Sequence, residues 1–279
     1  MRINANAKIN LTLDVVRKRE DGYHELDMIM VPLTLCDTLE ITLSDRDEII
    51  CGKENFPLTK QNTIYQAIAI MRETFHLQEH FKVIVEKKIP MQAGLAGGSA
   101  DGAAMLKAIV ALCHLHVEEE QLLTIAKKIG ADVPFCVVNE VARVQGIGEK
   151  VRRFALSTPF HLLLVKPKEG VSTGKAFSMI DFEHCDHPNV DLCEKALKEN
   201  DYETFCQCIG NTLEQPALLI TPIIANIKKE LKALGMDAVL MSGSGSTVFA
   251  ISQDEILIQK AKEHMAKRYD FVMACEIVR

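Results

Sequence analysis

Several well-known nucleotide-binding signatures are missing from this chain of 279 residues. It contains no Gly-x-x-x-x-Gly-Lys-Ser/Thr phosphate loop and no Gly-x-Gly-x-x-Gly loop; the nearest segment, Gly146–Val151, lacks the third glycine. The motif set of the eukaryotic-type protein kinases is also missing. A nucleotide site in this protein therefore has to be of another kind.

The cysteines form no recognisable pattern of disulfides or metal ligands. There are nine, an odd number, with no Cys-x-x-Cys pair and no signal peptide, which indicates reduced thiols in a cytoplasm. A loose cluster has a spacing that fits no zinc motif, so we expect no metal there; it consists of His184, Cys185, His187 and Cys193. No apolar run reaches the ~18 residues of a membrane span. We therefore expect a cytoplasmic protein with no membrane partner.

The charge balance limits the possible partners. The formal net charge is −6 at pH 7, which argues against a general nucleic-acid binder. An enzyme for anionic substrates would then need a locally positive site. With 279 residues, 48% of them hydrophobic, the chain is long enough for two domains with sizeable cores.

What the sequence does contain is a glycine-rich segment, Pro90–Asp101, between a strand-like run at Phe81–Glu86 and residues with helical spacing. This layout suits phosphate, because glycine lets the backbone approach an anion and the first N–H groups of the helix point at it. Ser99 suits either a helix cap or a phosphate ligand. Asp101 would repel phosphate, so we expect it to turn away. The alternative is a flexible turn with a capping serine.

Two polar groups stand out near the N-terminus. Lys8–Val15 alternates polar and apolar residues and predicts a half-buried strand, whose polar face would ordinarily meet solvent. An Asp-Gly turn follows, and beside it Tyr23 and His24 are either solvent-facing or a pair that recognises a base. An aromatic ring can stack on a base, and histidine can hydrogen-bond its edge.

The remaining periodicities predict an α+β protein. In the first half they predict strands at Leu26–Leu35 and Thr38–Leu43, an amphipathic helix at Asn62–Phe75, a helix at Glu118–Ile129 stopped by Gly130, and a strand at Val133–Val138. Asp132 precedes this last strand, where a carboxylate is more often a cap or turn residue than a catalyst.

The pattern breaks around Arg153–Pro159, and we place a domain boundary there, between residues 1–155 and 156–279. The second half predicts strands at His161–Val165, Ala238–Met241, Thr247–Ile251 and Phe271–Val278, and helices at Thr173–Ile180, Val190–Glu199, Tyr202–Leu213, Pro222–Leu234 and Asp254–Lys267. Its loop Ser242–Ser246 is either a plain hairpin turn or faces the first glycine loop across a domain cleft.

Three segments together resemble the GHMP-type small-molecule kinases, the group of galactokinase, homoserine kinase and mevalonate kinase. They are Ala7–Leu11, Pro90–Ser99 and Met241–Phe249. Within this group, Asp21–Glu25 and Gly130–Cys136 resemble the kinases that phosphorylate the 2-hydroxyl of a cytidine diphosphate-linked methylerythritol in the non-mevalonate isoprenoid pathway. The resemblance implies a two-domain GHMP kinase fold: an N-terminal domain like domain 2 of ribosomal protein S5, a C-terminal ferredoxin-like α/β sandwich, and an active site in the cleft between them.

The resemblance also implies roles for individual residues. Asp132 would be the general base for the substrate hydroxyl, and Lys8 would lie beside it and keep it ionised. The substrate would contact Asn10, Tyr23, His24 and Phe177. ATP with Mg²⁺ would bind at Asn62, Lys87, Pro90, Met91, Gln92, Ala93, Gly94, Leu95, Ala96, Gly97, Gly98, Ser99 and Ala100, with Ser99 on phosphate or metal.

Some positions depart from the family pattern. Asn6 and Ser246 stand where proline is usual, and Glu140–Arg143 replaces the usual Gly-Thr-Ala-Leu. Two other hypotheses therefore stay open: a GHMP-type kinase for another small alcohol, and a non-catalytic sensor that binds nucleotide. Intact Lys8 and Asp132 argue against the sensor. The expected partner is a small-molecule substrate, and both a monomer and a homodimer are compatible with the sequence.

Overall fold

The structure, a computed structural model, describes residues 1–54 and 56–278. The chain forms two compact units that are interleaved along the sequence. The first unit comprises Met1–Lys8, Thr34–Met91 and Ala96–Asn139, and the second comprises Ile9–Leu33, Gln92–Leu95 and Glu140–Arg279. These units do not follow the predicted division at residue 155, because two long strands contribute to both of them. That division stays a prediction.

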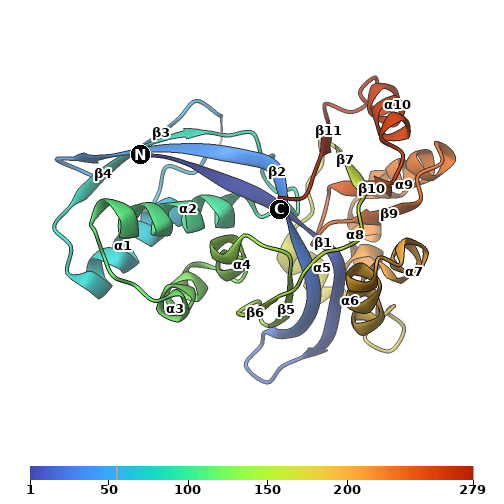
Figure 1. The fold of residues 1–279 in the computed structure, drawn as a ribbon, viewed down its shortest axis with the longest axis horizontal. Helices are drawn as coiled ribbons and strands as arrows, with labels where there is room; N and C mark the ends of the chain where they lie inside the picture. The colour runs from blue at the N-terminus through green and yellow to red at the C-terminus, as the bar shows by residue number, and fades with distance from the viewer. Residues whose placement is uncertain (55, 279) are drawn as a thin grey trace. The chain divides into compact units, whose positions relative to one another are not determined.

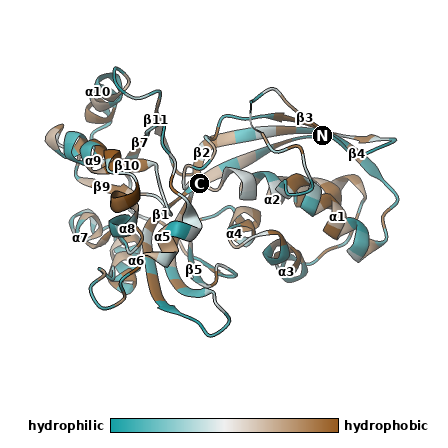
Figure 2. Cartoon of the chain, turned by 180° about the vertical axis from the view of Figure 1, so that it is seen from behind, coloured by the Kyte–Doolittle hydropathy of each residue, from teal (hydrophilic) through white to brown (hydrophobic). Residues whose placement is uncertain are grey.

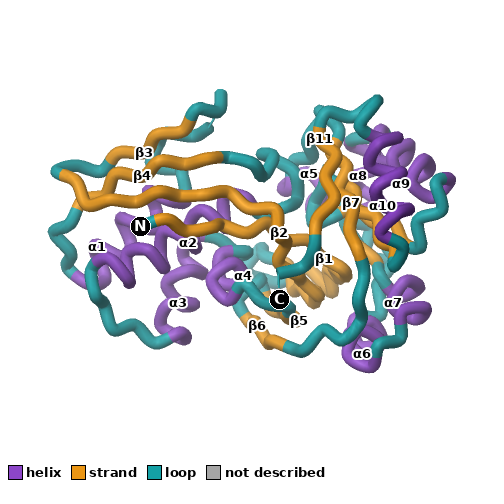
Figure 3. The backbone as a smooth tube through the Cα atoms, turned by 45° about the horizontal axis from the view of Figure 1, so that its top comes forward, coloured by secondary structure: helices purple, strands orange, loops and turns teal. Residues whose placement is uncertain are grey.

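In the first unit a β-sheet carries helices on one face (Figure 3). Strand β3 (Glu48–Cys51) pairs in parallel with β4 (His80–Glu86), and β4 pairs antiparallel with the C-terminal part of β2 (His24–Ser44). Helices α1 (Thr63–Phe75), α2 (Gly97–Leu112) and α3 (Glu119–Ile129) pack against one another. Both hydrophilic and hydrophobic residues appear on α1 in Figure 2, and its buried residues recur at the spacing of an amphipathic helix.

Three predicted elements of this half need correction. Val133–Val138 forms helix α4, and not a strand. A short apolar run fits either state, and the proline at its second position suits the first turn of a helix. The two strands predicted within residues 26–43 are one continuous strand, β2. Helix α3, by contrast, ends at Gly130 as predicted, with extended backbone at that residue (φ 176°).

In the second unit, strand β1 (Arg2–Lys18) lies between β2 and the short β8 (Gly210–Asn211). Strand β2 also pairs with β5 (Ala142–Gly146), which pairs with β6 (Lys150–Arg153). A separate antiparallel sheet has the order β11-β7-β10-β9 (Figure 1). Its strands are β7 (His161–Lys166), β9 (Ala238–Met241), β10 (Val248–Ser252) and β11 (Phe271–Cys275).

Helices α9 (Ile223–Ala233) and α10 (Glu255–Met265) pack on this second sheet. The other helices of the unit are α5 (Thr173–Ser178), α6 (Val190–Glu199), α7 (Tyr202–Cys208) and α8 (Glu214–Ile220). The helix predicted at 202–213 therefore ends early, and α8 was not predicted. The reason is that β8 pairs with β1, which is some 200 residues away (210 − 12 = 198) and leaves no local signal.

The polar face of β1 does not meet solvent, contrary to the sequence prediction. Lys8, Asn10 and Thr12 are as buried as the apolar residues between them. Buried polar groups need partners, and Thr12 Oγ1 accepts a hydrogen bond from the backbone N–H of Ile29 at 2.9 Å. The strand thus brings polar side chains into the interior, which a functional site can use and a purely structural strand would avoid.

Among the helices of residues 1–54 and 56–278, none combines the length and the apolar character needed to span a membrane.

Candidate functional site

The glycine-rich loop has a backbone suited to anions. Every second residue has a positive φ: 51° at Gln92, 72° at Gly94 and 56° at Ala96. Such alternation can turn successive N–H groups toward one side of the chain, where they form an anion-binding concavity. Helix α2 starts directly afterwards, and its N-cap residue Ala96 offers no capping side chain. The N–H groups of the first turn are therefore left for a ligand.

Ser99 and Asp101 both lie inside α2. Ser99 is the third helical residue, so it is not the N-cap that the sequence allowed. Within the described part of the chain its hydroxyl makes no hydrogen bond, and the residue is half-buried. Asp101 turns into the protein, as predicted, and accepts a hydrogen bond from Lys87 Nζ at 2.8 Å.

Lys87 is buried between two carboxylates. Its Nζ contacts Asp37 and Asp101, and the three side chains are 6%, 0% and 2% exposed. Asp37 also accepts from the backbone N–H groups of Lys88 and Ile89 at 2.6 and 2.9 Å. Burial raises the pKa of Asp101 to about 7. The neighbouring Lys87 ammonium lowers this pKa and the second carboxylate, Asp37, raises it. The ammonium is thus engaged inside the first unit, and its contact with a nucleotide stays a prediction.

Asn62 is the N-cap of α1. Its Oδ1 accepts from the N–H of Ile64 at 2.8 Å, and its Nδ2 donates to Pro57 O at 2.7 Å. Both ends of the amide therefore stabilise the fold, as expected of an asparagine cap. Its part in ATP binding stays a prediction.

The loop at residues 242–246 packs directly on the glycine-rich loop. Ser242 Oγ donates to Gly94 O at 3.0 Å, and the N–H of Thr247 donates to Ala93 O at 3.2 Å. A Cβ at Gly94 would lie 2.1 Å from Ser242 O, so only glycine fits there. The loop also connects antiparallel strands β9 and β10. It is a hairpin connection in contact with the first loop, and not a loop facing it across a cleft.

Lys8 and Asp132 form an ion pair in the first unit. Lys8 Nζ lies 3.4 Å from Asp132 Oδ2. Lys8 comes from β1, and Asp132 is the N-cap residue of α4, where the positive end of a helix favours a carboxylate. The Lys8 side chain is 5% exposed and that of Asp132 is 34% exposed. The carboxylate is therefore open to a solute, while the ammonium beside it is held inside.

One helical turn after Asp132, α4 carries a cysteine, Cys136, whose thiol is buried and unreactive. Cys136 donates its backbone N–H to Asp132 O at 3.1 Å and is buried. Burial, with a smaller contribution from Asp132, raises the pKa of the Cys136 thiol well above its ordinary value. The thiol therefore stays neutral and serves as packing.

His24 contacts two aromatic rings in the second unit. Its ring centroid lies 4.8 Å from that of Phe177, tilted by 34°, and 6.2 Å from that of Phe182, stacked at 16°. The adjacent Tyr23 is 60% exposed. Burial, and to a smaller extent the positive charge of Lys18, lowers the pKa of His24 and favours a neutral imidazole.

The structure therefore brings His24 and Phe177 together and adds Phe182, which the sequence did not reveal. Phe182 lies in the irregular segment between α5 and α6, where no periodicity indicates which residue contacts His24. Asn10, on β1, is fully buried, and its Nδ2 donates to Met28 Sδ at 3.3 Å. Its contact with substrate stays a prediction.

The segment Glu140–Arg143, which departs from the family pattern, makes ion pairs within the second unit. Glu140 Oε1 accepts from Arg153 Nε at 2.9 Å. Arg143 binds both carboxylate oxygens of Asp27 at 2.8 and 2.5 Å and contacts Glu194 at 3.2 Å. The charge that Glu140 adds is thus balanced locally, and the segment has a role in the fold.

The two positions where proline is usual also carry hydrogen bonds. Asn6 Oδ1 accepts from Nδ2 of Asn139, the C-cap of α4, at 3.3 Å. Ser246 Oγ donates to Glu169 O at 2.5 Å. Neither departure removes a group of the candidate site.

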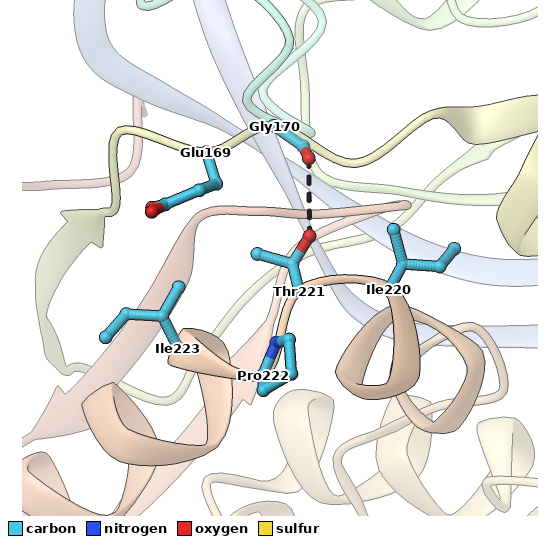
Figure 4. Close-up of a pocket in the computed structure, with 6 residues that line it drawn as sticks. All are labelled: Glu169, Gly170, Ile220, Thr221, Pro222 and Ile223. Atoms are coloured by element: carbon cyan, nitrogen blue, oxygen red, sulfur yellow. Dashed lines mark hydrogen bonds between the residues drawn. The ribbon is translucent and has the colours of Figure 1, made fainter.

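A pocket of about 330 Å³ lies in the second unit (Figure 4). It is lined by Glu169, Gly170, Ile220, Thr221, Pro222 and Ile223. Two of the lining residues are bonded to each other, since Thr221 Oγ1 donates to Gly170 O at 3.3 Å. None of the predicted site residues lines this pocket, and we assign it no part in the reaction.

Comparison with known proteins identifies the family. Residues 62–140 match the GHMP kinases N terminal domain, and residues 193–270 match the GHMP kinases C terminal domain. A 4-diphosphocytidyl-2-C-methyl-D-erythritol kinase of Bacillus pumilus is 40% identical over 276 residues, which cover 98% of this chain and 96% of that protein. The protein of the same name from Bacillus subtilis is 39% identical over 278 residues, with 98% and 96% covered.

A solved structure gives the same answer. The crystal structure of a 4-(cytidine 5′-diphospho)-2C-methyl-D-erythritol kinase aligns with a TM-score of 0.84 and 30% identity, and the alignment covers 100% of both chains. The expected two-domain α+β fold is thereby confirmed. The chain belongs to the GHMP kinase family, in the branch of the 4-diphosphocytidyl-2-C-methyl-D-erythritol kinases.

Proposed function

We propose that this protein catalyses the ATP-dependent phosphorylation of the 2-hydroxyl of 4-diphosphocytidyl-2-C-methyl-D-erythritol, in the non-mevalonate isoprenoid pathway. Near full-length similarity to proteins of that name supports the substrate. The observation that carries the chemistry is the pair of Lys8 and Asp132, an accessible carboxylate 3.4 Å from a buried ammonium.

Phosphoryl transfer depends mainly on alignment and charge neutralisation, so few protein groups suffice. We assign the role of general base to Asp132. Its carboxylate accepts the proton of the substrate hydroxyl, the hydroxyl oxygen bonds to the γ-phosphorus of ATP, and ADP leaves with the electron pair of the broken P–O bond. Lys8, whose ammonium lies 3.4 Å from the Asp132 carboxylate, holds the hydroxyl oxygen beside this base.

The ATP phosphates are assigned to the backbone of residues 90–100 and the first turn of α2. The alternating φ values and the helix start support this assignment. For Mg²⁺, the described residues include no group of three or more His, Cys, Asp or Glu side chains that could hold a metal ion. Mg²⁺ commonly binds substrate phosphates, waters and few protein oxygens, which fits the single hydroxyl of Ser99. There the ion would neutralise phosphate charge.

The cytosine is assigned to the group of Tyr23, His24 and Phe177. Aromatic rings can cover the face of the base, and a neutral imidazole has one donor and one acceptor for its edge. The half-buried position of His24 among phenylalanines supports this role. A cytoplasmic location is part of the proposal, and the nine free cysteines agree with it.

The test is ADP release with a panel of alcohols: the cytidyl substrate, the same methylerythritol phosphate without the cytidyl group, mevalonate, homoserine and galactose. We expect turnover with the cytidyl substrate and little with the others. Turnover with another alcohol alone would contradict the substrate. Nucleotide binding by calorimetry without ADP release from any alcohol would contradict the kinase activity.

A further inference from the structure

A thiol, an imidazole and a carboxylate lie in line in the second unit, and none of them has a role in the proposed reaction. Cys185 Sγ is 3.4 Å from His187 Nε2, and His187 Nδ1 is 2.6 Å from Asp14 Oδ1. Asp14 belongs to β1, while Cys185 and His187 lie in the segment between α5 and α6. The fold thus joins groups that are more than 170 residues apart (187 − 14 = 173).

These contacts fix the proton of the imidazole. A carboxylate can only accept, so the contact with Asp14 assigns the hydrogen to Nδ1 of His187 and turns the lone pair of Nε2 toward the thiol. Asp14 is itself held, since Thr212 Oγ1 lies 3.3 Å from its Oδ1 and 3.1 Å from Asp186 O. A nucleophile, a base and a group that orients the base are the parts of an activated nucleophile.

We propose that Cys185 is a site of thiol–disulfide exchange with a small disulfide, and that His187 acts as the base. Cys185 Sγ attacks one sulfur of the disulfide, a new S–S bond forms, and the old S–S bond breaks with its electron pair on the departing sulfur. The thiol proton passes to His187 Nε2 and from there to the departing sulfur. The products are a mixed disulfide on Cys185 and one free small thiol.

The surroundings of the thiol make the base necessary. Burial, followed by the charges of Asp14, Asp181 and Asp186, raises the pKa of Cys185, so little thiolate is present at neutral pH. Exchange therefore depends on removal of the proton during the attack. The same three carboxylates favour a cationic disulfide, such as cystamine, over an anionic one.

Other cysteines of the chain provide an internal comparison. Cys36, Cys51 and Cys113 have the same intermediate exposure as Cys185. In residues 1–54 and 56–278, however, the hydrogen bond between a cysteine and a histidine is made by Cys185 alone. These three cysteines therefore serve as internal controls: they are as accessible as Cys185 but have no histidine bonded to the thiol among the residues that the structure describes.

The experiment uses the reduced full-length protein and cystamine at pH 7, with acid quenching and peptide mass spectrometry of each cysteine. We expect Cys185 to form the mixed disulfide at least about tenfold faster than the three comparison cysteines, Cys36, Cys51 and Cys113. His187→Gln should slow Cys185 by roughly 10²-fold, the lower end of general-base effects. The matched control is His184→Gln, a neighbouring exposed histidine bonded to Asp181, and it should leave the rate nearly unchanged.

Two results would overturn the proposal: wild-type Cys185 reacting no faster than the comparison cysteines, or an unchanged Cys185 rate in His187→Gln. The rates of Cys51 and Cys113 in the same digests report whether a variant is folded. Asp14→Asn is a second variant that keeps the shape and should also slow Cys185. The readout is a mass shift, so it does not depend on the proposed kinase activity.

Discussion

Asp132 has the two properties that a general base of a kinase needs: a solute can reach it, and a fixed cation lies beside it. Neither property is visible in the sequence, where an isolated carboxylate before an apolar run is more often a cap. Asp132 is in fact also the N-cap residue of α4, although its side chain caps no N–H group. The N-cap position of α4 and the proposed general base are therefore the same residue.

Replacing Asp132 by asparagine should remove the proton acceptor and keep the shape. We expect kcat to fall by ~10²–10⁴-fold, while ATP affinity measured by calorimetry stays nearly unchanged. Glu140→Gln is the control, because Glu140 is a carboxylate paired with Arg153 and should not affect kcat. A kcat near that of the wild type in Asp132→Asn would exclude the assigned base.

Tyr23→Ala should weaken the cytidyl substrate far more than ATP. Stacking of a base on an aromatic ring contributes ~1–3 kcal/mol, so KM for this substrate should rise by about one to two decades. Tyr23→Phe keeps the ring and should retain most of the affinity. The deciding comparison is a substrate analogue without cytosine. If Tyr23→Ala weakens the analogue as much as the full substrate, Tyr23 has only a structural role.

Asp101 should make stability depend on pH. Burial raises its pKa from an ordinary 3.8 to about 7, so the folded protein favours the protonated form more than the unfolded chain does. The contribution of this group to the free energy of unfolding should therefore decrease as pH rises from about 4 to about 7 and stay constant above. Denaturant unfolding at pH 5 and pH 8 should show a smaller pH effect in Asp101→Asn than in the wild type. An equal effect in both proteins would contradict this.

Some candidate site residues could be selected from the sequence because they belong to contiguous motifs, as with Lys8, His24 and the glycine loop; their roles stay predictions. The pairing of Lys87 with Asp37 could not be predicted, since these residues are 50 positions apart and meet only through the register of β2 and β4. Phe182 was missed for a similar reason: its position beside His24 depends on the course of an irregular segment.

At the scale of elements, the glycines at the start of α2 differ in the space around them. A Cβ at Gly97 would lie 2.9 Å from Ile89 Cγ2 and 3.3 Å from Lys87 Nζ, so a substitution there disturbs packing as well as any ligand. At Gly98 the nearest neighbour of such a Cβ is Thr63 Oγ1, at 3.9 Å. Gly98 is therefore the better position for a test of phosphate binding.

Gly98→Val should weaken ATP while leaving the fold intact, because the added branch stands where the phosphates are assigned. We expect the Kd of ATP to rise at least about tenfold, equal to about 1.4 kcal/mol, with a small change in Tm. Gly98→Ala should have a weaker effect in the same direction. If ATP affinity measured by calorimetry is unchanged in both variants, the first turn of α2 is not the phosphate site.

Most strands and helices could be predicted from periodicity, because their apolar residues face one side. The failures have a common cause, which is pairing or packing that no local pattern reports. The sequence of α4 predicts a strand because all six of its residues are apolar, and a run without polar residues shows no helical period. The burial of the polar face of β1 is likewise a property of its neighbours and not of its own alternation.

At the scale of the whole molecule, the sequence predicts two consecutive domains, whereas each compact unit is built from three separate segments of the chain. The break in the pattern around Arg153–Pro159 carries no information on Ile9–Leu33. This segment joins the second unit through the pairing of β1 with β8 and through a hydrogen bond from Val278 N–H to Pro32 O at 2.9 Å. The predicted boundary at residue 155 therefore stays a prediction.

Residues 156–279 expressed alone should consequently fail to fold as a cooperative unit, because the compact unit they belong to also needs Ile9–Leu33 and Gln92–Leu95. We expect the full chain to show a single sharp thermal transition by circular dichroism and the fragment to show none. A cooperative transition in the fragment would indicate that the sequence-based boundary marks an independent domain.

The pairing of β1 with β8 also determines when, during synthesis, the second unit can fold. Thr12 leaves the ribosome early, and its partner Gly210 follows 198 residues later. At ~5–20 residues per second, the interval is roughly 10–40 s, during which this edge of β1 has no strand beside it. The first unit can fold once Asn139 has emerged, but the second can fold only when nearly the whole chain has been synthesised. A nascent chain stalled in the second half should therefore hold one finished unit and an unprotected strand, which makes it a substrate for chaperones.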